Sequence, residues 1–184
     1  MSTPLFAQNT VRVETGDFTY NQGDNILNLG LGLGATGGWG YGSLGFGVSL
    51  LGSYEFGFHR YISVGPYVGF ANYNYDYFGY SNSSVTSLAI GAKGSLHVIP
   101  FIAEVFDASW NPEKVDLYVA VYTGVRIRNN RYDVGNSDFN DSDVDLSFGT
   151  VPGIRYMPKE NIGIFGELGY GPLSVFTVGV TFEL

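Results

Sequence analysis

Apolar and polar residues alternate with a period of two along most of this chain of 184 residues. Successive side chains of a β-strand point to opposite faces, so the alternation predicts strands rather than helices. The eight predicted strands cover, to within about two residues, the ranges 25–36, 45–58, 61–73, 86–98, 115–128, 144–157, 162–170 and 174–184.

The two faces of each predicted strand differ chemically. In the fifth strand Val119, Val121 and Val125 alternate with Tyr118 and Tyr122, and elsewhere large apolar side chains alternate mainly with Gly, Ser and Thr. The interior of an eight-stranded barrel is only wide enough for side chains to fill it, and the bulky apolar face would overfill that space. A soluble barrel with an apolar lumen is therefore disfavoured. We expect an all-β fold, a closed eight-stranded antiparallel transmembrane up-and-down β-barrel with its apolar face toward lipid.

The spacing of the strands predicts an orientation. Outer-membrane barrels have short periplasmic turns and longer external loops, and an even strand number leaves both termini in the periplasm. We therefore expect the bacterial cell outer membrane as the location, with both termini periplasmic. The predicted external connections are 37–44, 74–85, 129–143 and a tight turn at 171–172, and the predicted periplasmic ones are 58–60, 99–114 and 157–161.

The connection at 99–114 is longer and more apolar than a periplasmic turn should be. It could hold a short helix at the inner interface, or form an irregular loop anchored by Phe101, Phe106 and Trp110 at headgroup level. A third possibility is a docking surface for another envelope protein. The sequence leaves these three open.

Composition agrees with a membrane barrel. The 27 Gly, 14 Tyr and 14 Phe beside only 14% charged residues suit strands and tight turns. No run approaches the roughly 18 apolar residues that a spanning helix needs. A net charge of −8 argues against nucleic acid as a partner, and the absence of Cys excludes disulfides and thiolate metal sites.

Residues 1–23 are predicted to be a signal remnant and N-terminal extension, and residues 24–184 the outer-membrane β-barrel domain. The run STPLFAQN is typical of the tail of a secretory signal. An ordinary disordered N-terminus is the alternative.

Several runs of the chain resemble a known family. The most telling are ISVGPYVGFANY in the third strand, PEKVDLY at the entry to the fifth and FGELGYG before the last. Over residues 24–184 the chain resembles the small outer-membrane β-barrel domain proteins common in Bacteroidetes-type bacteria. The resemblance implies an eight-stranded outer-membrane barrel and brings no defined catalytic site.

The last strand resembles the C-terminal recognition signal of outer-membrane barrels, although Leu184 stands where the usual aromatic residue would be. The resemblance implies handling by periplasmic chaperones and the barrel-assembly machinery. The residues of this assembly signal are Val178, Val180, Phe182 and Leu184.

Charged residues also fall on the predicted lumen face, where they must be paired because the space is too small to hydrate them separately. We expect them to form an ion-pair network that plugs the barrel; a narrow path for ions or small solutes is the alternative. This predicted lumen charge network comprises Glu55, Lys93, Arg126, Arg128, Arg155, Glu167 and Glu183.

No catalytic, cofactor or metal site is predicted. A lipid-modifying outer-membrane enzyme would need a His beside a Ser near the outer leaflet, but His59 and His97 both fall toward the periplasmic end. The acidic loop at 129–145 is loosely similar to calcium loops, yet it lacks the turn Gly and the closing Glu, so a solvated acidic loop is expected.

The favoured function is therefore structural, envelope-stabilising or partner-docking, with a narrow pore or small-solute transporter as the alternative and a lipid-modifying enzyme a more remote one. Expected partners are outer-membrane lipid and lipopolysaccharide, and the barrel-assembly machinery during biogenesis. Another envelope protein could bind through residues 99–114 or the outer loops.

Overall fold

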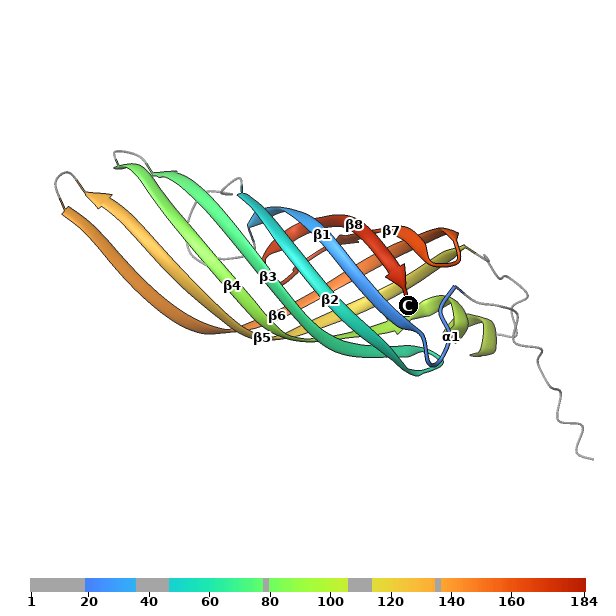
Figure 1. The fold of residues 1–184 in the computed structure, drawn as a ribbon. Helices are drawn as coiled ribbons and strands as arrows, with labels where there is room; N and C mark the ends of the chain where they lie inside the picture. The colour runs from blue at the N-terminus through green and yellow to red at the C-terminus, as the bar shows by residue number, and fades with distance from the viewer. Residues whose placement is uncertain (1–18, 36–46, 78–79, 106–113, 135–136) are drawn as a thin grey trace, which may run out of the picture.

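The computed structural model describes residues 19–35, 47–77, 80–105, 114–134 and 137–184. Its strands form a closed barrel in sequence order, in which every neighbouring pair is antiparallel and β1 pairs with β8 (Figure 1). The prediction of a closed eight-stranded antiparallel transmembrane barrel is confirmed. The strands are β1 Asn25–Ala35, β2 Gly47–His59, β3 Ile62–Tyr77, β4 Tyr80–His97, β5 Val115–Val134, β6 Ser137–Lys159, β7 Ile162–Leu168 and β8 Ser174–Glu183.

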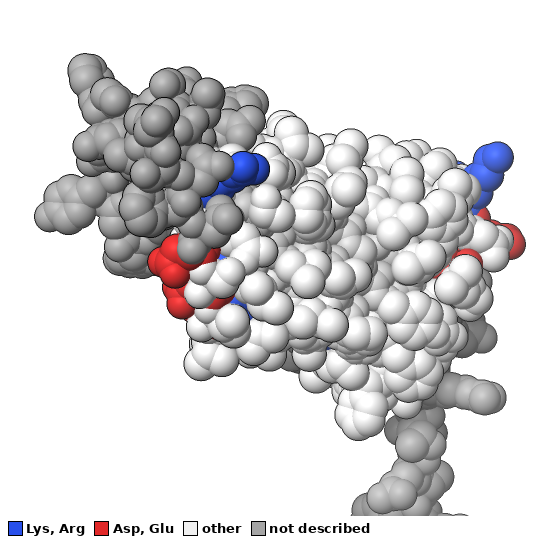
Figure 2. Space-filling view, turned by 60° about the vertical axis from the view of Figure 1, so that its left-hand side comes forward, with Lys and Arg blue, Asp and Glu red and all other residues white. Residues whose placement is uncertain are grey.

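The alternation of the sequence becomes the inside and outside of the barrel. On β5, Val121 is 50% exposed whereas the next residue, Tyr122, is fully buried. On β2, Leu50 is 56% exposed and Leu51 only 7%. Figure 2 shows the outcome on one face, where a broad band free of charged side chains separates Lys, Arg, Asp and Glu gathered at the two ends. The apolar band is the surface that meets hydrocarbon.

The two ends of the barrel differ. We call the end that bears Asp24, Leu184 and the β2–β3 and β6–β7 turns the terminal end, and the end that bears the β3–β4 and β5–β6 hairpins the hairpin end (Figure 1). The hairpins extend well past the rest of the rim, because β7 has only 7 residues and β6 has 23.

The loops predicted at 74–85 and 129–143 are a correction, since most of both ranges is strand. Apolar alternation ends there because both faces of a strand beyond the membrane can be polar. Hydrogen bonds across the strands take over, as Ser142 Oγ donates to Asn129 Oδ1 at 2.6 Å. Register continues from Arg126↔Asp145 to Val134↔Ser137.

The connection that broke the loop-length rule begins with a helix, α1, spanning Val98–Val105. Its Ile99 is buried, and Phe101 and Ile102 are exposed. A short helix is one of the three possibilities that the sequence leaves open for this connection. Phe106 and Trp110 lie outside the described residues. The predicted loop 37–44 and the predicted signal remnant up to residue 18 also lie outside them. Within the described part of the chain, no helix has the length and apolar content needed to cross a membrane.

Candidate functional site

The lumen holds a cluster of buried polar and charged side chains centred on Glu55 of β2. Its carboxylate lies 3.0 Å from Lys93 Nζ of β4 and 3.8 Å from Arg155 Nη2 of β6. It also accepts hydrogen bonds from Asn28 Nδ2 and Ser63 Oγ, both at 2.8 Å. Glu55 is fully buried. A buried carboxylate surrounded in this way is ionised, since charged and neutral donors satisfy both of its oxygens.

Lys93 joins this carboxylate to a second one. Its Nζ lies 2.9 Å from Glu167 Oε1 of β7, and it sits 5.2 Å and 5.4 Å from the ring centroids of Tyr118 and Tyr122. Both tyrosine hydroxyls donate to Glu167, at 3.0 Å and 2.8 Å. The ammonium is thus held between two carboxylates and two aromatic faces, which is an environment that stabilises a buried cation.

A second branch of the cluster lies toward the terminal end. Arg155 Nη1 lies 2.7 Å from Asp116 Oδ2, and His97 Nδ1 lies 2.9 Å from the same oxygen. The other ring nitrogen of His97, Nε2, is 3.0 Å from Ser63 Oγ. Since Ser63 also contacts Glu55, the two branches form one continuous network.

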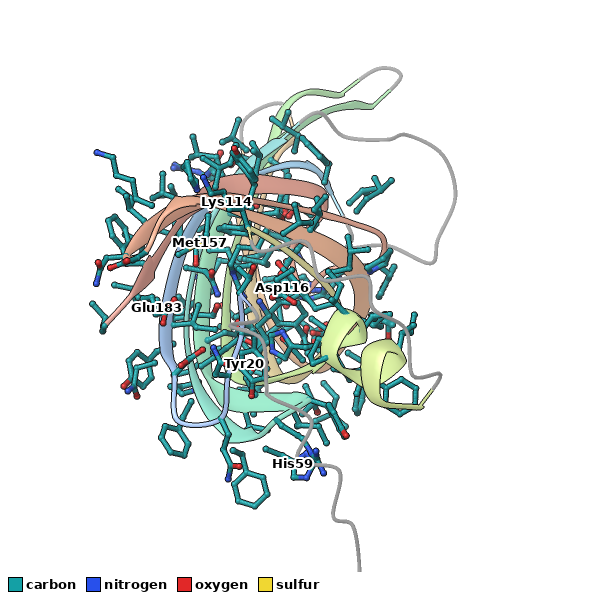
Figure 3. All side chains as sticks on the ribbon, turned by 90° about the vertical axis from the view of Figure 1, so that its right-hand side faces the viewer. Tyr20, His59, Lys114, Asp116, Met157 and Glu183 are labelled. Carbon is teal, nitrogen blue, oxygen red and sulfur yellow. The ribbon has the colours of Figure 1, made fainter. Side chains whose placement is uncertain are left out.

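Tyr20 closes the network at the terminal end. Its ring stacks on His97 with centroids 3.4 Å apart and planes only 4° from parallel. Its hydroxyl lies 2.6 Å from the carbonyl oxygens of His59 and Ile62. Burial and the nearby carboxylate of Asp24 raise the pKa of the Tyr20 hydroxyl, so it stays a neutral donor. Figure 3 looks into this end: Tyr20 and Asp116 lie within the ring of strands, and His59 lies outside it.

The structure brings together four of the seven predicted lumen charges, namely Glu55, Lys93, Arg155 and Glu167. It does not bring in the other three. Arg126 and Arg128 lie nearer the hairpin end and pair with acidic residues of β6. Glu183 lies at the end of β8 and is only half-buried.

The acidic stretch 129–145 is another correction, because the described part is not a loop of free carboxylates. Arg126 contacts Asp145 at 3.1 Å, and Arg128 contacts Asp143 at 3.1 Å and Asp145 at 2.7 Å. The side chains of Asp133 and Asp138 lie outside the described residues. Where the chain is described, no group of three or more His, Asp or Glu side chains is placed to hold a metal ion.

Sequence reasoning missed Asp116, His97 and Tyr20 as members of the network. Asp116 is recoverable, because the alternation of the fifth strand puts it on the same face as Tyr118 and Tyr122. The alternation of the fourth strand puts His97 on the lumen face too, but a single His does not by itself indicate an ion-pair network. Tyr20 precedes the first strand, and no periodicity marks it.

Ser63, His97 and Asp116 have the order of contacts found in acyl-transfer triads, with Ser Oγ to His Nε2 and His Nδ1 to Asp. The surroundings oppose that chemistry. All three side chains are sealed from solvent, and the Glu55 carboxylate 2.8 Å from Ser63 Oγ would repel the oxyanion formed on attack. The arrangement is therefore a structural part of the lumen network.

Comparison with known proteins supports the fold. No protein-family model matches the chain, and no curated protein matches it. A de novo designed transmembrane β-barrel superposes with a TM-score of 0.52 at 14% identity, covering 90% of this chain and 98% of the design. Neisserial surface protein A (NspA) superposes with a TM-score of 0.50 at 15% identity, covering 89% of this chain and 98% of NspA. At such identities the likeness shows an outer-membrane β-barrel fold and leaves the role open.

Proposed function

We propose that this chain is an integral outer-membrane protein with a sealed lumen, whose role is structural: it stabilises the envelope or presents a surface to a partner. The observation that supports this best is the buried network of Glu55, Lys93, Glu167 and Arg155 across the barrel. The side chains of Lys93 and Glu55 are fully buried, and those of Glu167 and Arg155 are only 3% and 2% exposed.

A conducting path would have to separate these charges. Breaking a buried ion pair strands a charge in a medium of low dielectric, which costs several kcal/mol. Four ion pairs join the five charged residues Glu55, Lys93, Asp116, Arg155 and Glu167, so they would have to part together. The stacked Tyr20 adds a second barrier at the terminal end.

The rest of the proposal concerns the surroundings of the barrel. We assign the terminal end to the periplasm because its connections at 60–61 and 160–161 are tight turns, and the projecting hairpins to the outside. Lipid and lipopolysaccharide would meet the apolar band, and the outward residues Val178 and Val180 would serve the assembly machinery. Membership of the Bacteroidetes-type barrel family, and docking of an envelope protein through 99–114 or the hairpins, belong to the same proposal.

Planar-bilayer recording tests it. We expect the purified wild-type protein to give no steady conductance, because the lumen charges stay paired. An Arg128→Met variant, which alters a pair at the hairpin end, should be equally silent. Reproducible open-channel steps from the wild type would contradict the proposal that the lumen is sealed.

A narrow solute path is the second candidate, and one observation favours it. The buried atoms Asn28 Oδ1, Thr181 Oγ1 and Arg155 Nε have no hydrogen-bond partner in the described structure. Such atoms attract water, and connected water would favour small-solute passage. The same recordings, extended to swelling of proteoliposomes in small sugars, distinguish the two candidates.

A further inference from the structure

Both ring nitrogens of His97 face groups that fix where protons lie. Nδ1 is 2.9 Å and 3.0 Å from the two oxygens of Asp116. Arg155 holds this carboxylate in its ionised form through a 2.7 Å contact. An ionised carboxylate can only accept hydrogen bonds, so Nδ1 must carry a proton.

The contacts of Ser63 decide whether the other ring nitrogen of His97, Nε2, carries a proton. Its single hydroxyl proton has two neighbours, His97 Nε2 at 3.0 Å and Glu55 Oε2 at 2.8 Å. Glu55 is also contacted by Lys93 and Arg155, so its oxygens are acceptors only. If Ser63 donated to His97, its oxygen lone pairs would face a carboxylate oxygen in a buried site. If Ser63 donates to Glu55 instead, Ser63 Oγ accepts a hydrogen bond from a protonated Nε2.

The charge balance leads to the same result. The network contains three carboxylates, on Glu55, Asp116 and Glu167, and two permanent cations, on Lys93 and Arg155. A protonated His97 would be the third cation and bring the sum to zero. Uncompensated charge is costly in a buried site, so the balanced state is favoured.

We propose that His97 is held as a doubly protonated imidazolium, which serves as the third cation of the lumen. The groups around it are Asp116 and Tyr118 on β5, Arg155 on β6, Glu55 on β2, Ser63 on β3, and Tyr20 with Asp24 before β1. The parallel ring of Tyr20 over His97 is a favourable contact for a cation and excludes water from its face.

The experiment uses the fact that the chain has only two His. Protein labelled with ¹⁵N-histidine in detergent micelles is recorded by NMR at pH 8. We expect His97 to show two protonated nitrogens, and the exposed His59 to give a separate set of signals. The variant His59→Gln assigns the signals by removing one set, without touching the lumen.

One outcome overturns the proposal: a single protonated nitrogen on His97, with the other accepting from Ser63. Urea unfolding at pH 8 is the second readout, in which His97→Gln should lower the stability of the barrel and His59→Gln should not, because only the first variant removes the cation that contacts Asp116. If His97→Gln does not fold, the NMR result on His59→Gln still decides. Neither measurement depends on whether the barrel conducts, so the proposed function can fail separately.

Discussion

At the scale of single residues, height along the barrel axis decides which charges meet. Alternation places Arg126, Arg128 and Arg155 on the lumen face alike, but only Arg155 lies level with Glu55. The other two meet Asp145 and Asp143, their register partners on β6. A sequence of period two specifies the face of a side chain and says nothing of its height, which comes from the register of eight strands closing together.

The Lys93 pairs allow a test at this scale. Lys93→Met should destabilise the barrel by about 3–5 kcal/mol, because Glu55 and Glu167 lose a shared cation in a buried site. Adding Glu167→Gln to Lys93→Met should recover part of the loss. Urea unfolding in lipid vesicles measures the free energies.

The control is the exposed pair near the hairpin end. Arg128→Met breaks contacts with Asp143 and Asp145, whose side chains are 56% and 27% exposed, and should cost at most about 1 kcal/mol. Equal losses for Lys93→Met and Arg128→Met would contradict a buried network that contributes to stability through paired charges.

At the scale of elements, the sequence predicts strands well where lipid constrains one face. The predicted start of β1 at 25 and of β5 at 115 agree with the structure, as do the exposed faces of β2 and β5. Prediction from the sequence fails at 74–85 and 129–143. No hydrocarbon enforces alternation of apolar and polar residues there, and pairing between strands alone maintains them. The sequence does not distinguish α1 from a loop, because a short apolar run suits a helix and a loop equally.

Close backbone approach between β4 and β5 gives an element-scale prediction. A Cβ added at Gly124 would lie 2.2 Å from the carbonyl oxygen of Ile90 and 2.7 Å from Gly91 Cα. Gly124→Ala should therefore destabilise the barrel by about 1–3 kcal/mol, because backbone must shift. Gly166→Ala is the matched control, as nothing lies within 4 Å of its added Cβ. Thermal unfolding compares the two, and a neutral Gly124→Ala would rule out this tight approach.

At the scale of the whole molecule, the asymmetry of the two ends predicts how the barrel sits in the cell. A short epitope inserted at Ser137 should be reached by antibody on intact cells, because the proposed orientation puts the β5–β6 hairpin on the external side. One inserted after Asn161 should be reached only after the outer membrane is permeabilised. The reverse pattern would invert the proposed orientation while leaving the barrel fold unaffected.

The network also constrains how the protein enters a membrane. Its charges come from five strands: Glu55 on β2, Lys93 on β4, Asp116 on β5, Arg155 on β6 and Glu167 on β7. The β6–β7 hairpin by itself joins Arg155 and Glu167, which the structure does not pair, and the β2–β3 hairpin has Glu55 without its cations. The β5–β6 hairpin does carry a matched pair, Asp116 with Arg155, but a partly inserted sheet that lacks β4 would still leave Glu55 and Glu167 without Lys93. Insertion one hairpin at a time is disfavoured, and the strands should cross the bilayer in a concerted step or within a hydrated, chaperoned intermediate.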